Sequence, residues 1–419
     1  MAGPGQDGQR IALGKNPGRS RSHNRRVVLD LVRSRGHLGR KALADLTQLS
    51  TQAVANIIDE LLAENLLVDL GRRRSGRGQP PIQFAINPDG AITIGFEVAV
   101  SRLVTTVLDL GGNIRDSRSA QLDDAAPDIL IPRLAAEVAA IRDRYRTTLT
   151  GVGVVMPGPF EIEGLSGVGP TTLPGWAGVD VAGRLGALIG VPVVVENDAN
   201  AAAVGETLFG AGQHLNSFCV IYFGAGLGLG IIHENLPLRG AFGNAGEIGH
   251  IVVVPRGRAC ACGQRGCLER YASLHALHER LGRSTDYDDL ARMMGAGDPA
   301  LSDWLDEAAD HLAPMIAMLE NTLDPETVIL GGALPDGIID ALIGRLSLGT
   351  SVANRRDRAV PRVIRGRTGQ MTAALGAAAL PFSEALTPRL DTGPGPGSET
   401  SASETPADDM PAATVAVAN

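Results

Sequence analysis

The sequence predicts an α/β domain preceded by a small winged helix-turn-helix domain. From residue 91 to about residue 381, apolar strand patterns alternate with amphipathic segments and Gly-rich turns. Residues 21–86 show three helical patterns followed by two strand patterns. We therefore expect a disordered basic arm at 1–20, the winged domain at 21–86, the α/β domain at 87–385 and a disordered tail at 386–419.

Three helices are expected in the winged domain. The first begins at Asn24 and ends near Gly36, and the second covers residues 40–46. Ser50 is placed to cap the third helix. The apolar positions of the first and third helices recur at helical spacing: Val27, Val28, Leu31 and Val32, then Val54, Ile57, Ile58, Leu61 and Leu62. Two strands, at 66–68 and 82–86, enclose an Arg-rich loop.

This winged domain is expected to bind double-stranded DNA. In such a motif the third helix enters the major groove by its N-terminal turn, so Thr51, Gln52 and Asn56 are the candidates for base contacts. The candidates for phosphate or minor-groove contacts are Arg72, Arg73, Arg74 and Arg77. Net charge is −8, yet residues 10–41 hold ten basic side chains and one acid. The alternatives are a solvated helical bundle and a winged domain that contacts protein.

The α/β domain is expected to contain a hairpin, a long helix and several buried strands. Their expected positions are 92–96 and 103–110 for the hairpin, 126–146 for the helix, and 151–156, 191–195, 218–223 and 327–330 for the strands. No internal sequence repeat is visible. Active sites of such sheets lie at the strand ends.

One His and three Cys have the spacing of a zinc site. They are His250, Cys260, Cys262 and Cys267. Zinc takes nitrogen and sulfur ligands tetrahedrally, and Gly263 and Gly266 let the loop turn sharply between the cysteines. Because all four positions are filled, the site reads as structural. The alternatives are three buried thiols beside an unrelated His, or a disulfide.

Cysteine usage and hydropathy favour a cytoplasmic protein. Four cysteines in 419 residues, three of them in the zinc set, leave no disulfide framework. No stretch reaches the ~20 apolar residues needed to span a bilayer. Residues 1–17 also lack the apolar core of a signal peptide.

Seven segments resemble the ROK family of bacterial repressors, open-reading-frame products and sugar kinases. The segments are 156–159, 173–176, 196–202, 224–230, 246–250, 260–269 and 330–332. The most specific is Cys-x-Cys-Gly-x-x-Gly-Cys-x-Glu after Gly-Glu-Ile-Gly-His. The resemblance implies the two-lobed, ribonuclease H-like fold of actin-like ATPases.

The resemblance also implies a sugar pocket. Its residues fall on Asn197, Asp198, Glu247, His250 and Glu269. In the kinases the counterpart of Asp198 is the general base. Taken alone, residues 196–198 are equally compatible with a turn that caps the following helix. Where the family usually has an Asn sugar contact, this chain has Thr172, which cannot make both amide hydrogen bonds.

The nucleotide side departs from the family pattern. Residues 97–102 read Glu-Val-Ala-Val-Ser-Arg in place of Asp-x-Gly-Gly-Thr-Lys, so Ala99 and Val100 replace two glycines. A β-branched Val100 is expected to strain the backbone there. Ala225 replaces a Thr in a second phosphate turn. Because phosphoryl transfer relies on positioning phosphates, we expect no catalysis, with Asp198 a vestigial base.

These observations favour a sugar-responsive transcriptional regulator, a repressor in the first instance. It is expected to bind an operator as a homodimer or homotetramer, with one structural zinc per chain and a sugar or sugar derivative as effector. One alternative is a sugar kinase fused to a DNA-binding domain. The other is a regulator controlled by a partner protein, with no sugar ligand.

Overall fold

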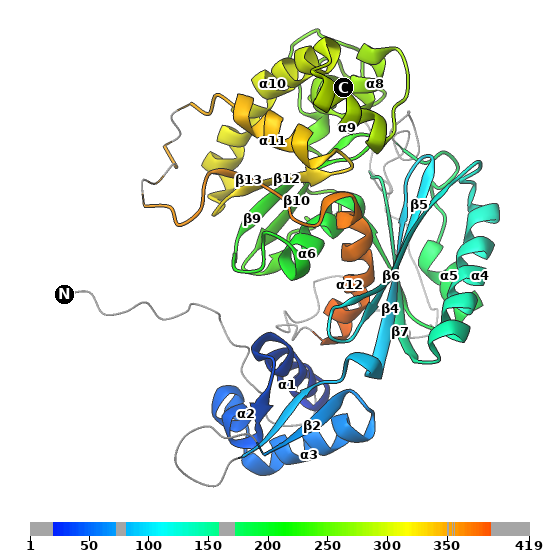
Figure 1. Cartoon of the computed structure of the whole chain (residues 1–419), viewed down its shortest axis with the longest axis vertical. Coiled ribbons are helices and arrows are strands. Elements are labelled where there is room, and N and C mark those ends of the chain that lie inside the picture. Colours follow the sequence, from blue (N-terminus) through cyan, green and yellow to red (C-terminus); the bar gives the residue numbers. More distant parts are fainter. Residues whose placement is uncertain are drawn as a thin grey trace, which may run out of the picture.

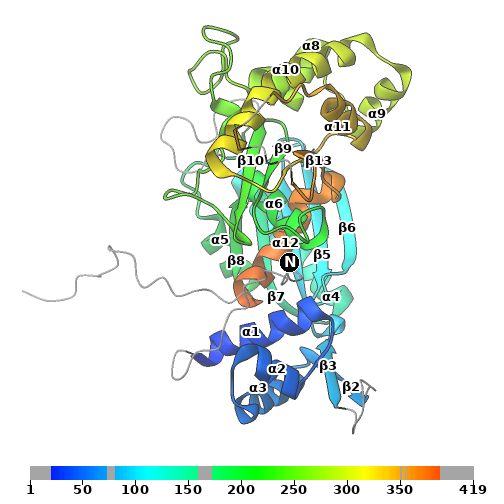
Figure 2. The same ribbon diagram turned by 90° about the vertical axis from the view of Figure 1, so that its left-hand side faces the viewer.

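The computed structural model describes residues 20–72, 81–158, 172–349, 352–353, 355 and 357–386. Figure 1 shows a small N-terminal domain below two larger α/β lobes, and Figure 2 shows the same order from the side. Both expected termini, at 1–20 and 386–419, fall almost wholly outside the described residues. Within the described residues, no helix combines the length and apolarity needed to cross a membrane.

The N-terminal domain has the predicted winged-helix architecture. Its elements are α1 (Ser20–Arg35), β1 (Leu38–Gly39), α2 (Arg40–Thr47), α3 (Thr51–Ala63), β2 (Leu67–Arg72) and β3 (Ile82–Ile86), and the strands pair in the order β1-β3-β2. Ser50 caps α3 as expected, because its hydroxyl accepts from the Ala53 amide at 3.2 Å. The predicted apolar residues of α1 form one core with Val54, Ile58 and Leu61.

Part of the basic charge of this domain is neutralised internally. Arg25 of α1 donates two hydrogen bonds to Glu64 at the end of α3, each 2.5 Å long. Arg21 pairs with Glu60, and Arg40 lies 2.8 Å from Asp59. These arginines hold α1 and α2 against α3, so the excess of basic residues in the sequence overstates the charge free to meet phosphates.

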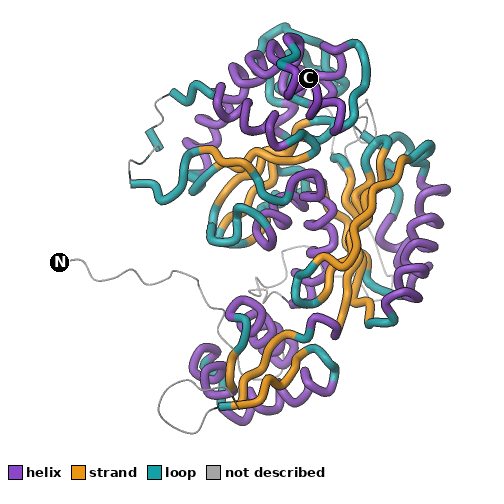
Figure 3. Tube along the Cα trace, in the orientation of Figure 1, coloured by secondary structure: helices purple, strands orange, loops and turns teal. Residues whose placement is uncertain are grey.

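The first lobe is a five-stranded mixed sheet covered on both faces. Its elements are η1 (Pro88–Gly90), β4 (Ala91–Val98), β5 (Arg102–Asp109), β6 (Ile114–Gln121), α4 (Pro127–Tyr145), β7 (Thr148–Met156), α5 (Val181–Ile189) and β8 (Val193–Asn197). The strand order is β6-β5-β4-β7-β8. Figure 3 shows α4 and α5 on one face and the C-terminal helix on the other. Strand β6 was not expected from the sequence, because this edge strand is polar and largely exposed.

The second lobe repeats this topology. Its elements are α6 (Asp198–Phe209), β9 (Phe218–Phe223), β10 (Leu227–His233), β11 (Leu236–Pro237), η2 (Ile248–His250), α7 (Glu269–Ala272), α8 (Leu274–Leu281), α9 (Tyr287–Ala296), α10 (Pro299–Leu323), β12 (Val328–Gly332), α11 (Asp336–Arg345) and β13 (Val363–Arg365). The order β11-β10-β9-β12-β13 again joins three antiparallel strands to two parallel ones.

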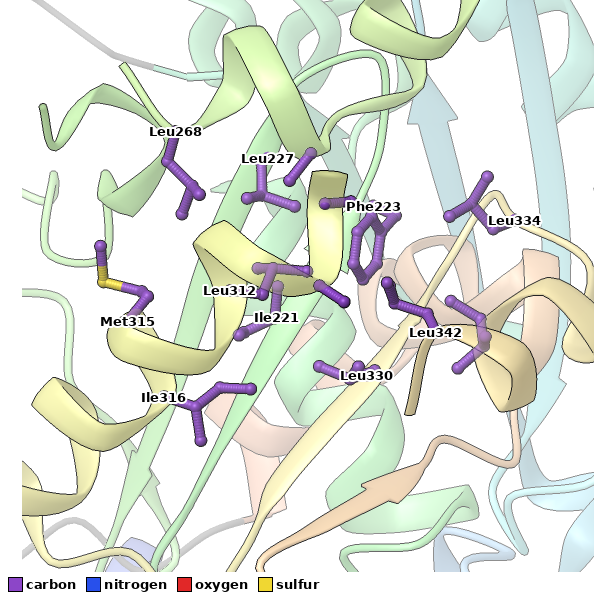
Figure 4. Packing of buried hydrophobic residues seen from close by; sticks show 14 of the residues in the cluster. Ile221, Phe223, Leu227, Leu268, Leu312, Met315, Ile316, Leu330, Leu334 and Leu342 are labelled. Carbon is purple, nitrogen blue, oxygen red and sulfur yellow. The ribbon is translucent and has the colours of Figure 1, made fainter. Parts of the chain in front are cut away.

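The core of the second lobe explains why its strands are continuously apolar. Figure 4 shows Ile221 and Phe223 of β9 beside residues of α10 and α11, in the cluster that also holds Cys219. Phe218 and Val220 belong to the cluster that contains residues of α6. In the family segment 224–230, residues 224–226 form the turn and β10 begins at Leu227. Alternating glycines in β10 are needed because α6 lies close on that face.

The last helix, α12 (Thr372–Leu386), follows η3 (Gly369–Met371) and lies between the two lobes (Figure 1). It packs backbone to backbone against both. A Cβ on Gly153 of β7 would lie 1.9 Å from the Ala377 carbonyl oxygen, and one on Gly376 would lie 1.8 Å from that of Ala201 in α6. Only glycine permits such approaches, so α12 fixes the lobes relative to each other.

The winged domain joins the first lobe without a linker. β3 runs through the single turn η1 into β4. The Asn87 side chain donates to the Asn65 backbone oxygen at 2.8 Å, which ties the end of α3 to this turn. Leu66 and Ile86 pack against both the winged-domain core and the core around α12. The orientation of the winged domain is therefore set by the lobes.

We expect Gly376→Ala to lower the thermal stability of the protein, despite the higher helix propensity of Ala. The new methyl group would meet the Ala201 carbonyl, and overpacking of this kind costs about 1–3 kcal/mol. The matched control is Gly344→Ala in α11, where a Cβ meets nothing within 4 Å. Thermal unfolding should show a loss for the first variant and none for the control; equal melting temperatures would contradict the packing argument.

Candidate functional site

A polar pocket lies at the ends of β8, β9 and β10, where the α6 N-terminus and two loops meet. Five of the expected pocket residues line it: Asn197, Asp198, Glu247, His250 and Glu269. Thr172 does not; it is buried, outside the lining. The lining also includes Pro157, Gly158 and Tyr222, which were not expected as site residues. Gly158 belongs to a matching family segment, whereas nothing in the sequence marks Tyr222.

Asn197 both caps α6 and faces the pocket. Its side-chain oxygen accepts from the Ala199 amide at 2.8 Å and the Asn200 amide at 3.4 Å. The capping interpretation and the pocket interpretation are therefore compatible. A Cβ on Gly158 would lie 2.6 Å from Asn197 Nδ2 and 2.8 Å from Glu247 Oε1. The absence of a side chain at residue 158 thus lets both polar groups reach the pocket.

Asp198 begins α6 and is a half-buried residue of the pocket lining. Burial raises its pKa to about 8, and the neighbouring Glu97 carboxylate adds to the rise. Its hydrogen bond from the Ala199 amide, 2.8 Å long, opposes the shift. The Asp198 carboxyl therefore holds a proton at neutral pH.

The Gly-Glu-Ile-Gly-His segment is held on β10 by its backbone. The Leu229 amide donates to the Gly246 oxygen at 2.9 Å, and Gly246 has φ +99°. A Cβ there would lie 1.9 Å from the Leu229 oxygen, so this position requires glycine. Glu247 and His250 of this segment both line the pocket.

The expected metal ligands come together. One ligand atom from each of His250, Cys260, Cys262 and Cys267 lies within 4.8 Å of the others. The sulfur atoms of Cys262 and Cys267 are 3.6 Å apart, well beyond the ~2.05 Å of a disulfide bond, so the disulfide alternative is not supported. Gly263 and Gly266 have positive φ, as the turn requires. Three sulfurs and one imidazole are a donor set that suits zinc.

The cysteine loop supports two pocket residues. Cys260 Sγ lies 3.0 Å from Glu269 Oε1 and 3.6 Å from His250 Nδ1. Glu269 starts α7, directly after Cys267 and Leu268. A metal bound by Nδ1 leaves the other ring nitrogen of His250 for the pocket, so the metal centre can orient the site without taking part in chemistry.

The turn at residues 97–102, where the family pattern binds nucleotide phosphates, differs from the expectation in one respect. The turn between β4 and β5 closes with a hydrogen bond of 2.8 Å from the Ala99 amide to the Arg102 oxygen. Val100 is not among the described residues with positive φ, so the expected backbone strain at Val100 is wrong. The side chains beside this turn contact one another. Arg102 pairs with Glu97 at 2.9 Å, and the Tyr222 hydroxyl lies 3.3 Å from the same carboxylate oxygen.

The candidate DNA contacts lie on the outer face of the winged domain. Thr51, Gln52 and Asn56 are exposed on α3, and Gln52 Nε2 donates to Asn56 Oδ1 at 2.9 Å. Arg72 is exposed at the end of β2. The other loop arginines, Arg73, Arg74 and Arg77, lie outside the described residues.

We expect one zinc per chain and its loss in Cys262→Ser, because a missing thiolate leaves the tetrahedral set incomplete. The matched control is Cys219→Ala, since Cys219 lies in β9 outside the cluster. Elemental analysis of protein purified without chelators should find zinc in the wild type and the control. Zinc-free wild-type protein would remove the metal from this site.

Asp198 should make the protein less stable as pH rises from about 4 to 8. Its folded pKa is about 8 and its unfolded value 3.8, so in this range the folded state binds the additional proton. Asp198→Asn removes the titration, so the variant should exceed the wild type in free energy of unfolding by at least ~1 kcal/mol at pH 8.5. The difference should be small at pH 4. Chemical denaturation at both pH values tests this; a difference independent of pH would contradict it.

Comparison with known proteins places these features in one family. Residues 93–383 match the ROK family. A xylose repressor of Bacillus spizizenii is 28% identical over 317 residues, which cover 74% of this chain and 82% of the repressor. A glucokinase of Streptomyces coelicolor is 31% identical over 314 residues, covering 69% of this chain and 97% of the kinase.

Solved structures of ROK proteins have the same fold as this chain. A ROK family transcriptional regulator, homologous to the E. coli MLC protein, matches with a TM-score of 0.70 and 23% identity over 87% of this chain and 96% of its own. A ROK family glucokinase from Streptomyces griseus, in complex with glucose and AMPPNP, matches with a TM-score of 0.57 and 28% identity over 69% of this chain and 98% of its own. The chain, with its two-lobed α/β fold and N-terminal winged helix, belongs to the ROK family.

Proposed function

We propose that this protein is a DNA-binding transcriptional repressor whose operator affinity is controlled by a sugar. Residues 21–86 would bind DNA and residues 87–385 would sense the sugar, with one structural zinc at His250, Cys260, Cys262 and Cys267. The observation that carries the proposal is the direct junction of the winged domain to the pocket-bearing lobes through β3, η1 and β4. The similarity to xylose repressors over 74% of the chain supports it.

The pocket is suited to a polyhydroxylated ligand. Carboxylates of Asp198, Glu247 and Glu269 can accept from hydroxyl groups, and the amide of Asn197 can donate. These groups converge from α6, the Gly246–His250 loop and α7, whose backbone contacts hold them in place. Such preorganised polar groups favour sugar binding without further ordering of the site.

A sugar can act only if it binds one arrangement of the protein better than another. A ~100-fold change in operator affinity requires about 2.7 kcal/mol of differential binding. A homodimer or homotetramer would present two DNA-binding heads, and a change in lobe orientation would alter their spacing. The close packing of α12 between the lobes offers a route, because α6 begins at the pocket and contacts α12 along its length.

The second candidate is a sugar kinase, which the similarity to glucokinases favours. Two features of the site oppose it. Ala99 and Val100 replace two glycines of the turn that the family pattern uses for phosphates. Arg102, at the position of the family's Lys, is already paired with Glu97, whose carboxylate also accepts from Tyr222.

DNA binding should depend on α3 and weaken steeply with salt. With roughly six phosphate contacts per bound unit, log affinity should fall with log salt at a slope of about −5. Gln52→Ala should cost about 1–3 kcal/mol at the selected site and little on random DNA, whereas Arg72→Ala should weaken both alike. Fluorescence anisotropy on sites selected from random DNA measures each effect.

The sugar response is tested in the same assay. Glucose, mannose, allose, xylose and the N-acetyl amines are added to the protein–DNA complex, and ATP consumption is followed with each sugar. Release of DNA by one sugar without ATP consumption supports the proposal. Sugar-dependent ATP turnover that Asp198→Asn abolishes would establish the kinase instead. No response to any sugar would favour control by a partner protein.

A further inference from the structure

The charges around the pocket have one sign. Besides Asp198, which holds a proton at neutral pH, the carboxylates of Glu247 and Glu269 line it. Among the described lining residues there is no Lys or Arg, and His250 belongs to the cysteine cluster. Bound phosphate groups usually have Arg, Lys or a row of backbone amides as partners. This pocket offers a phosphate group no free cationic side chain.

Two arginines stand close to the pocket, and each already has a buried carboxylate partner. Arg239, in the loop that leads to Gly246, pairs with Glu196, next to Asn197. Arg102 donates to Glu97 at 2.9 Å and to Gln370 at 3.4 Å. Moving either guanidinium to a ligand would leave a buried carboxylate unpaired, which is strongly unfavourable.

Glu97 also places further negative charge behind the pocket. One of its oxygens takes the hydrogen bonds from Arg102 and Tyr222, and the other is buried with no hydrogen-bond partner among the described residues. The Glu97 carboxylate interacts with the carboxyl group of Asp198 in the pocket lining. Glu97 and Tyr222 come from different lobes, so this contact also closes the space between them.

We propose that Glu97, Arg102 and Tyr222 form a closed end that makes the pocket selective for uncharged sugars and excludes their phosphates. The inference rests on the proposed sugar-binding function and names its ligand class. A sugar phosphate carries about two negative charges at pH 7. It would meet the lining carboxylates of Glu247 and Glu269 and the Glu97 carboxylate, with both nearby arginines engaged.

Isothermal titration calorimetry of the full chain tests the inference. The ligands are glucose, mannose and N-acetylglucosamine, each beside its 6-phosphate, and xylose beside xylose 1-phosphate. The sugar that binds best should bind at least ~30-fold more tightly than its phosphate, as expected for juxtaposed like charges. A phosphate that binds as tightly as its parent sugar, or more tightly, would overturn the inference while leaving a sugar-derivative sensor intact. Failure of every ligand would overturn the proposed function and the inference together.

Glu97→Gln tests the closed end directly. The substitution removes one negative charge and releases Arg102 from its ion pair. The ratio of the dissociation constant of the sugar phosphate to that of the sugar should therefore fall by about tenfold. The matched control is Glu307→Gln, which removes the same charge from an exposed cluster with Arg258 and Arg280. Zinc content and circular dichroism confirm folding. An unchanged preference in folded Glu97→Gln would contradict the role of Glu97, and the wild-type comparison decides the selectivity even if this variant does not fold.

Discussion

The structure depends on the contact of α12 with both lobes at backbone distance. Four glycines make it possible: Gly95 and Gly153 in the first sheet, Gly205 in α6 and Gly376 in α12 itself. Three layers thereby pack as closely as the interior of a single domain, although their residues lie far apart in the sequence. Because α6 begins at Asp198 and is capped by Asn197, the geometry of the pocket and the relative position of the lobes follow from the same packing.

Sequence reasoning succeeded where the determinants are local. The Ser50 cap, the apolar periodicity of α3 and the spacing of the cysteines each act within about 20 residues, and the structure contains all three features. It failed where partners are distant. Strand β6 carries no apolar face, because it is an exposed edge, and only pairing with β5 makes it a strand. The matching strand order of the two sheets leaves no trace in the sequence, since burial constrains the residue class and not its identity.

The pocket residues also divide into those that a local sequence pattern predicts and those that only distant contacts bring together. Asn197, Asp198, Glu247, His250 and Glu269 could be placed from family segments, but Thr172 lies outside the lining and Tyr222 was not expected. The Glu97–Arg102–Tyr222 contact joins β4, β5 and β9, which no sequence pattern connects. Glu97 occupies the position of the Asp in the family's Asp-x-Gly-Gly-Thr-Lys segment. Its buried, unpartnered oxygen is an uncommon feature in a folded protein, and such local inconsistencies tend to occur at functional sites.

The junction at Asn65 and Asn87 couples the orientation of the winged domain to that of the lobes. A flexible tether would let a winged domain turn independently of the lobes; here Leu66 and Ile86 belong to two cores at once, so a rotation of the lobes would also turn the winged domain. DNA presents equivalent groove faces about every 34 Å, so in the proposed homo-oligomer two winged domains would have to reach the DNA in helical phase. A small rotation of the lobes would displace α3 by more than it displaces the junction. The two winged domains would then no longer be in helical phase with the DNA. The difference in DNA affinity between the sugar-free and sugar-bound states would then depend on the alignment of the two winged domains. No base-contacting side chain would need to change.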